Sequence, residues 1–285
     1  MNYINLRGDI KMKLSIWSSY YKELSPEDAL RTFKKHGYDW CELSDEHALE
    51  LIERGNPKTV GREFGSFAKE LGVGVLQGHL FLNAKICRPK DRELLEKQLD
   101  LFYEIGIKNA VLHCDNFSRL PENPGVEFKR EQNLAALVEL TDYIKDTDMV
   151  ICLENLRPPR FTTSAESLLY FIDKINSKNL GICLDTGHLN LSENPSQIEF
   201  IEKAGKHIKA LHLADNDGLG VDQHLMPYGR GVVDFVAVIR EMKKLGYDGL
   251  YNLEIPGERK VPLEISYHKL DYIKKMFDYL DKITE

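Results

Sequence analysis

The feature that most constrains the fold of this chain is an alternation of short apolar runs with longer segments of helical periodicity, repeated eight times. Strict alternation of this kind favours parallel strands joined by helical crossovers. Eight units favour a closed barrel over an open doubly wound sheet, and no glycine-rich phosphate-binding turn follows the first strand. The predicted strands span residues 13–20, 39–44, 72–81, 108–115, 150–156, 180–188, 208–216 and 249–257.

Helices are predicted between these strands from their punctuation and their apolar faces. Ser25 precedes Pro26 and two acidic residues, which is typical of a helix start. Residues 91–105 carry leucine and phenylalanine on one face, and Gly106 ends that helix. Further helices are predicted at residues 129–147, 164–176, 195–207, 233–245 and 265–283, the last of them packing as the final outer helix.

The chain length fits one barrel. Such a domain takes about 250 residues, and this chain has 285 with no linker or shift in composition. We therefore predict a single α/β domain, a (β/α)8 barrel over residues 12–285, preceded by an N-terminal extension at residues 1–11.

Composition restricts the classes of function. The five cysteines lie mostly in apolar runs without the spacing of a disulfide framework, which predicts reduced thiols and a cytoplasmic protein. The sequence shows neither a signal peptide nor an apolar run long enough to span a membrane, so no membrane partner is expected. The net charge of −7 weighs against nucleic-acid binding, although it does not exclude a local basic groove.

Carboxylates and imidazoles gather where the predicted strands end, and in a barrel this end carries the function. Singly, each has a structural interpretation, such as a hydrogen-bonded histidine or a carboxylate that caps the next helix. Together at one rim they predict a metal site. The set consists of His79, His113, Glu154, Asp185, His188, His212, Asp222, His224 and Glu254. Two of these nine residues, Asp222 and His224, lie in the loop after the seventh strand.

Four further histidines and one tryptophan lie outside this set. His36, His47, His207 and His268 end helices or lie in helical patterns, and we interpret them as structural. Trp17, at the end of the first strand, either forms the floor of a substrate pocket or only packs.

Side-chain alternation predicts what lies beneath the set. Residues two positions before a ligand candidate share its face of the strand. These residues are small or apolar, as expected for a packed layer inside the barrel, and they are Val111, Cys152, Cys183 and Ala210.

Glu154, Asp185 and Glu254 would repel one another in a shared pocket unless they took up protons or a cation. Carboxylate-rich ligation with one imidazole, from His212, suits Mn²⁺, Mg²⁺, Zn²⁺ or Co²⁺, and no sulfur ligand is placed to select a soft metal. We predict one divalent metal ion, or as many as three if the remaining five residues of the set also bind metal.

The motifs around these residues resemble the xylose isomerase-like TIM barrel superfamily, which contains sugar isomerases and epimerases, inosose dehydratases and endonuclease IV. The resemblance runs from Lys13 to about Glu285. Its carriers are CLEN around Glu154, LDTGH at 184–188, HLADND at 212–217, DQHLMPYGRGVVDF at 222–235 and LEIPG around Glu254.

In the ketose epimerases of this superfamily, residues that match Glu154, Asp185, His212 and Glu254 hold one metal, and the two glutamates also move the substrate proton. This chain departs from that branch because Gly218 and its neighbours stand where the epimerases have an arginine. With the other five residues, it instead matches the nine ligands that bind three zinc ions in endonuclease IV.

The resemblance leaves two functions open. The first is a metal-dependent isomerase or epimerase of carbohydrate metabolism, acting on a small ketose or polyol-derived substrate through an enediolate. Glu154 and Glu254 would be its base and acid, and His188 would hydrogen-bond a substrate oxygen. Its partner would be a small sugar, and the sequence leaves open whether the chain forms a homo-oligomer.

The alternative is an endonuclease IV-like phosphodiesterase, or a lyase or dehydratase of the same superfamily. Net charge and the lack of evident basic loops weigh against the nuclease. Phe81 and Leu82 could wedge into DNA or equally cover a sugar.

Overall fold

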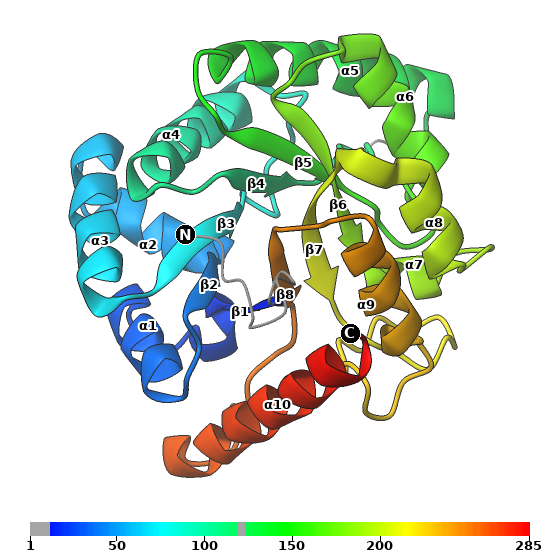
Figure 1. Ribbon diagram of the computed structural model, residues 1–285. Coiled ribbons are helices and arrows are strands. Elements are labelled where there is room, and N and C mark those ends of the chain that lie inside the picture. Colours follow the sequence, from blue (N-terminus) through cyan, green and yellow to red (C-terminus); the bar gives the residue numbers. More distant parts are fainter. Residues whose placement is uncertain (1–11, 119–122) are drawn as a thin grey trace.

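The computed structural model describes residues 12–118 and 123–285. Eight parallel strands follow one another around a closed barrel, and β1 pairs with β8 to complete the ring (Figure 1). The predicted (β/α)8 fold is confirmed, whereas the predicted extension at 1–11 lies outside the described residues. The strands are β1 (Lys13–Trp17), β2 (Trp40–Leu43), β3 (Gly74–His79), β4 (Asn109–Leu112), β5 (Val150–Glu154), β6 (Leu180–Asp185), β7 (Ile208–Leu213) and β8 (Leu250–Leu253).

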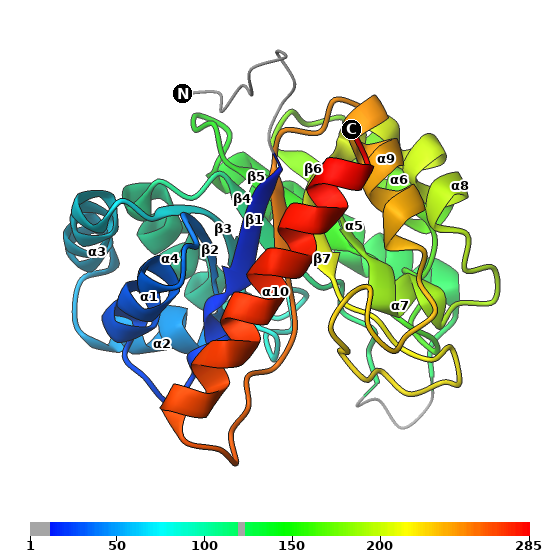
Figure 2. The same cartoon turned by 60° about the horizontal axis from the view of Figure 1, so that its bottom comes forward.

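Helices surround the barrel, and α10 lies along its outer wall beside β1 (Figure 2). Ser25 caps α1 by accepting the Asp28 N–H at 3.2 Å, and Gly106 ends α4 with a φ of 99°. The helices are α1 (Pro26–Lys35), α2 (Asp45–Glu53), α3 (Pro57–Leu71), α4 (Pro89–Ile105), α5 (Val126–Tyr143), α6 (Ala165–Ile175), α7 (Thr186–Asn190), α8 (Gln197–Ala204), α9 (Phe235–Lys244) and α10 (Leu263–Ile283), with short 3₁₀ turns at Ser18–Tyr21 and Gly205–His207. No helix in the described ranges is long and apolar enough to cross a membrane.

Several elements differ in extent from the predictions, and three differences concern the placement of residues or helices. The first strand ends at Trp17, because residues 18–21 form a 3₁₀ turn. The sixth strand ends at Asp185, whose carboxylate caps α7 by accepting the His188 N–H at 2.6 Å. His188 is therefore on a short helix and not at a strand end, which corrects its predicted place. Residues 45–71 contain two helices, α2 and α3, which were not predicted separately.

The interior of the barrel holds a small packed layer of its own. Val111, Cys152, Cys183 and Ala210 are fully buried and form a cluster separate from the large core between strands and helices. Strand register places them side by side, since Val111 pairs with Cys152 and Cys183 pairs with Ala210. The predicted apolar layer is confirmed, and it closes the barrel beneath the strand ends.

Candidate functional site

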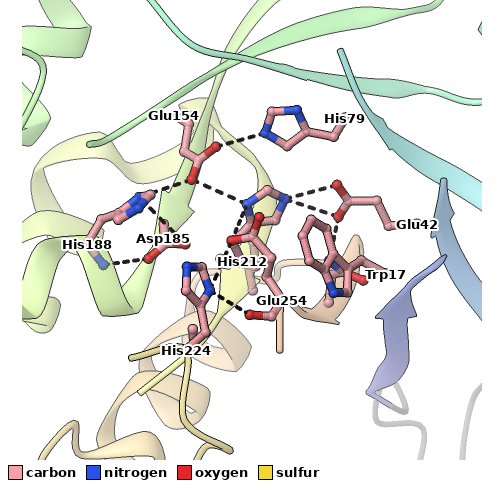
Figure 3. Close-up of polar contacts among 12 residues, drawn as sticks. Trp17, Glu42, His79, Glu154, Asp185, His188, His212, His224 and Glu254 are labelled. Atoms are coloured by element: carbon pink, nitrogen blue, oxygen red, sulfur yellow. Dashed lines mark hydrogen bonds and ion pairs between the residues drawn. The ribbon is translucent and has the colours of Figure 1, made fainter. Parts of the chain in front are cut away.

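Four side chains from consecutive strands meet above this layer (Figure 3). Glu154 ends β5, Asp185 ends β6, His212 lies near the end of β7, and Glu254 directly follows β8. None is more than 5% exposed. One ligand atom of each lies within 4.8 Å of those of the other three, so the four residues, called here the inner set, could hold one metal ion.

Each member of the inner set has a buried polar atom without a hydrogen-bond partner in the described structure. These atoms are Glu154 Oε1, Asp185 Oδ2, His212 Nδ1 and Glu254 Oε2. His212 Nδ1 lies 3.4 Å from both Glu154 Oε1 and Glu254 Oε2. Leaving such atoms unpaired costs about 1–3 kcal/mol each. Because three oxygens and one nitrogen converge, the donor set fits a hard or borderline divalent cation.

The charges of the inner set are strongly perturbed. Burial raises the pKa of Asp185 to about 7, with His188 opposing and Glu254 adding to the shift. Burial also works against ionised Glu254, but the His212 imidazole lowers the pKa of that carboxyl to about 2. The pKa of Glu154 likewise lies well below its usual range, since His212 and His113 outweigh the effect of burial. Near neutral pH, three adjacent carboxylates are thus balanced by protons on neighbouring groups, which a cation would displace.

His79 and His113 form a second group around the far oxygen of Glu154. His113 Nε2 lies 2.9 Å from Glu154 Oε2, and His79 Nε2 lies 3.3 Å from it. Burial lowers the pKa of His113, whereas in His79 the Glu154 carboxylate outweighs burial and raises the pKa to about 9. Together with Glu154, these two histidines could hold a metal.

A third group combines α7 with the loop between β7 and α9. Asp222 Oδ2 accepts from His188 Nε2 at 3.0 Å and lies 3.3 Å from His224 Nε2. Arg157 Nε approaches the same carboxylate to 3.8 Å. Burial opposes the ionisation of Asp222, but the two imidazoles hold the pKa of this carboxyl well below its usual value. His188, Asp222 and His224 could also hold a metal, so the structure brings all nine predicted residues to one end of the barrel.

Glu42, on β2, is a site residue that the sequence reasoning missed. Its side chain is fully buried and lies against His212, with Oε1 3.0 Å from His212 Nε2 (Figure 3). A signal existed, because a glutamate between Cys41 and Leu43 in a short apolar strand alternates into the barrel. The prediction considered strand ends alone and therefore passed over it.

Trp17 is half-buried and packs against the main core. Its Nε1–H donates to the Ile255 carbonyl at 3.0 Å, next to Glu254. Of the four histidines interpreted as structural, His36 pairs with Asp271 at 2.7 Å and His47 bonds the Leu24 carbonyl at 3.0 Å. None of the four belongs to a potential metal-binding group within residues 12–118 and 123–285.

The chain is similar in sequence to several known proteins. An uncharacterised protein of Methanocaldococcus jannaschii is 32% identical over 200 residues, covering 68% of this chain and 67% of that protein. L-ribulose 3-epimerase of Methylomonas sp. is 26% identical over 246 residues, covering 84% and 81%. A protein named "Probable endonuclease 4" from Mycoplasmopsis synoviae is 30% identical over 135 residues, covering only 44% and 46%.

Solved structures show the same fold. The crystal structure of D-psicose 3-epimerase in the presence of D-fructose superposes with a TM-score of 0.79 at 14% identity, covering 94% of this chain and 99% of that one. The model of the xylose isomerase-like TIM barrel family matches residues 30–283. The chain therefore belongs to the xylose isomerase-like TIM barrel family.

Proposed function

We propose that this protein is a metal-dependent epimerase or isomerase acting on a small ketose or polyol-derived ketone. The observation that carries the proposal is the convergence of four buried ligand atoms, from Glu154, Asp185, His212 and Glu254, that have no hydrogen-bond partner within the described part of the chain. The similarity to L-ribulose 3-epimerase over most of both chains supports sugar chemistry at this site. The cation would be Mn²⁺, Mg²⁺, Zn²⁺ or Co²⁺, in accordance with the oxygen-rich donor set.

The chemistry follows from the positions of the two glutamates. When bound, a divalent cation supplies Lewis-acid polarisation of the substrate carbonyl oxygen. Glu154 and Glu254 project from β5 and β8, and their low pKa values keep both ionised and able to accept a proton. One would remove the proton beside the carbonyl, and the other would first take up a proton from solvent and then deliver it to the opposite face of the enediolate. The first glutamate would lose its proton to solvent afterwards, so that both carboxylates return to the ionised state. Asp185 and His212 would serve as ligands only.

Two further residues would contact the sugar. His188 Nδ1 is fixed by the Asn155 carbonyl at 3.1 Å, which leaves Nε2, now paired with Asp222, to bond a substrate oxygen. Trp17 would offer an apolar ring face, held in place by its bond to Ile255.

A phosphodiesterase of endonuclease IV type is the second candidate. It is favoured by the two outer groups, His79–His113 and His188–Asp222–His224, which adjoin the inner set. Phe81 is only 8% exposed and packs in the core, which disfavours both roles considered for it, a wedge into DNA and a cover for a sugar. The partial coverage of the endonuclease relative also disfavours this candidate.

The direct test combines metal content with two assays. Elemental analysis of the purified protein would give the number of metal ions per chain. A panel of ketoses in D₂O, followed by NMR, would detect exchange of the hydrogen next to the carbonyl, and abasic-site DNA would test for strand cleavage. We expect one tightly bound ion, deuterium incorporation and intact DNA. Cleavage of DNA by a three-metal protein that exchanges no sugar hydrogen would overturn the proposal.

A further inference from the structure

The imidazole ring of His212 lies between the carboxylate of Glu42 on one side and those of Glu154 and Glu254 on the other (Figure 3). On one side, Nε2 lies 3.0 and 3.1 Å from the two carboxylate oxygens of Glu42. On the other side, Nδ1 faces Glu154 and Glu254 and has no hydrogen-bond partner in the described structure. The two nitrogens therefore have different surroundings, one saturated and one open to the inner set.

We propose that Glu42 is a positioning residue for the metal. Its carboxylate accepts the Nε2 proton of His212 and so presents the Nδ1 lone pair to the cation. A neutral imidazole has one donor and one acceptor nitrogen, and the partner of the donor decides which tautomer is present. A carboxylate in this role also orients the ring and makes the ligand nitrogen more basic. This inference rests on the metal site of the proposed function.

The surroundings of Glu42 suit this role. Its Oε2 accepts from Gln77 Nε2 at 2.6 Å and from Asn252 Nδ2. Ser15 Oγ in turn donates to Asn252 Oδ1 at 2.9 Å. These bonds join β1, β2, β3 and β8, and they place the amide donors on Oε2, so that Oε1, the oxygen slightly nearer to His212 Nε2, has the imidazole as its partner.

A purely structural role explains the arrangement less well. Within the described residues, His212 is the only ionisable group in an ion pair with Glu42, and both side chains are fully buried. Burying a carboxylate is costly, and an apolar side chain would fill the same place in a packed barrel at lower cost. The buried carboxylate is explained if it acts on His212, because its oxygens lie within hydrogen-bond distance of the imidazole Nε2 and of two amide donors.

The test uses Glu42→Gln in the full-length protein. Metal affinity would be measured by Co²⁺ titration in competition with a chromophoric chelator. We expect Co²⁺ binding to weaken by roughly 10- to 100-fold, the usual effect of losing a carboxylate behind a ligating histidine. Ser15→Ala is the matched control, because it removes the far end of the same network and leaves Glu42 in contact with His212; its Co²⁺ affinity should stay within about threefold of wild type.

A second measurement needs no variant. In the Zn²⁺-loaded wild-type protein, ¹⁵N NMR of labelled histidines should show His212 protonated at Nε2 and metal-bound at Nδ1. Metal on Nε2, or unchanged Co²⁺ affinity in a folded Glu42→Gln protein, would overturn the inference and leave the proposed metal site intact. A wild-type protein that binds no metal at all would instead remove the proposed function and this inference with it.

Discussion

The inner set and the two outer groups differ in how fully the protein itself supplies hydrogen-bond partners for their side-chain atoms. Each inner residue keeps one buried atom without a hydrogen-bond partner among the residues that the structure describes. Three of the four outer histidines, His79, His188 and His224, are instead anchored on both sides, because each bonds a backbone carbonyl through Nδ1 and faces a carboxylate through Nε2. A cation at the inner set would replace the ion pairs of His212 Nδ1 with Glu154 and Glu254, both at 3.4 Å, whereas at the outer groups it would replace closer ion pairs, at 2.9–3.3 Å. This difference indicates that the inner set fills first.

Metal removal should have the largest effect. Exhaustive chelation is expected to reduce turnover to background and to lower the melting temperature, because only the folded chain assembles the inner set. At a free metal concentration of 100 times Kd, the bound ion adds about 2.7 kcal/mol to the free energy of unfolding. Differential scanning calorimetry with chelator and with metal added back checks both parts. Unchanged melting and turnover after verified removal of metal would exclude a metal site.

Loss of either glutamate should come next. Glu154→Gln and Glu254→Gln remove a proton-transfer group, while an amide oxygen remains as a weaker ligand. Turnover of the identified ketose should fall by roughly 10²- to 10⁴-fold. Glu70→Gln, at an exposed position on α3, is the matched control and should behave as wild type. Full activity in both site variants would contradict the roles proposed for the two carboxylates.

Substitutions in the outer groups sharpen the comparison further. With one metal in the inner set, Asp222→Asn and His224→Ala should lower turnover by less than about tenfold, because they reshape the pocket without removing a ligand. The metal content should stay at one ion per chain. If instead these variants, with His79→Ala and His113→Ala, lose as much activity as the glutamate variants and also lose metal, the three-metal alternative is correct.

The smallest effect concerns pH. The pKa of His79 is raised to about 9 and that of His224 to about 10 in the metal-free fold, against 6.5 in the unfolded chain. Their protonation therefore stabilises the fold fully below pH 6.5, and this contribution is lost as the pH rises toward 9 and 10. Melting of metal-free protein between pH 6.5 and 9 should shift downward, and bound metal should flatten the trend. A rise in stability over this range would contradict the pKa shifts.

Most of the site could be predicted from sequence rules that depend on neighbouring residues, whereas one site residue and one element boundary were missed. Strand periodicity and strand ends placed Glu154, Asp185 and His212 correctly, because these features depend on neighbouring residues. Glu42 was missed because only strand ends were considered, and its partner His212, 170 residues away, is brought to it by the closure of the barrel. His188 was placed on a strand because the apolar run was extended through Asp185; the cap by which Asp185 begins α7 is a local contact, three residues along the chain, and was not recognised.

The two buried thiols beneath the site provide a measure of how fast the barrel opens. Burial raises the pKa of Cys152 and Cys183, so both stay protonated and unreactive while the barrel is closed. They lie on β5 and β6, two residues before Glu154 and Asp185. The rate at which these two cysteines are alkylated therefore measures how fast the strands that carry the ligands open. A bound ion would slow alkylation, and this slowing would report occupancy of the site without any knowledge of the substrate.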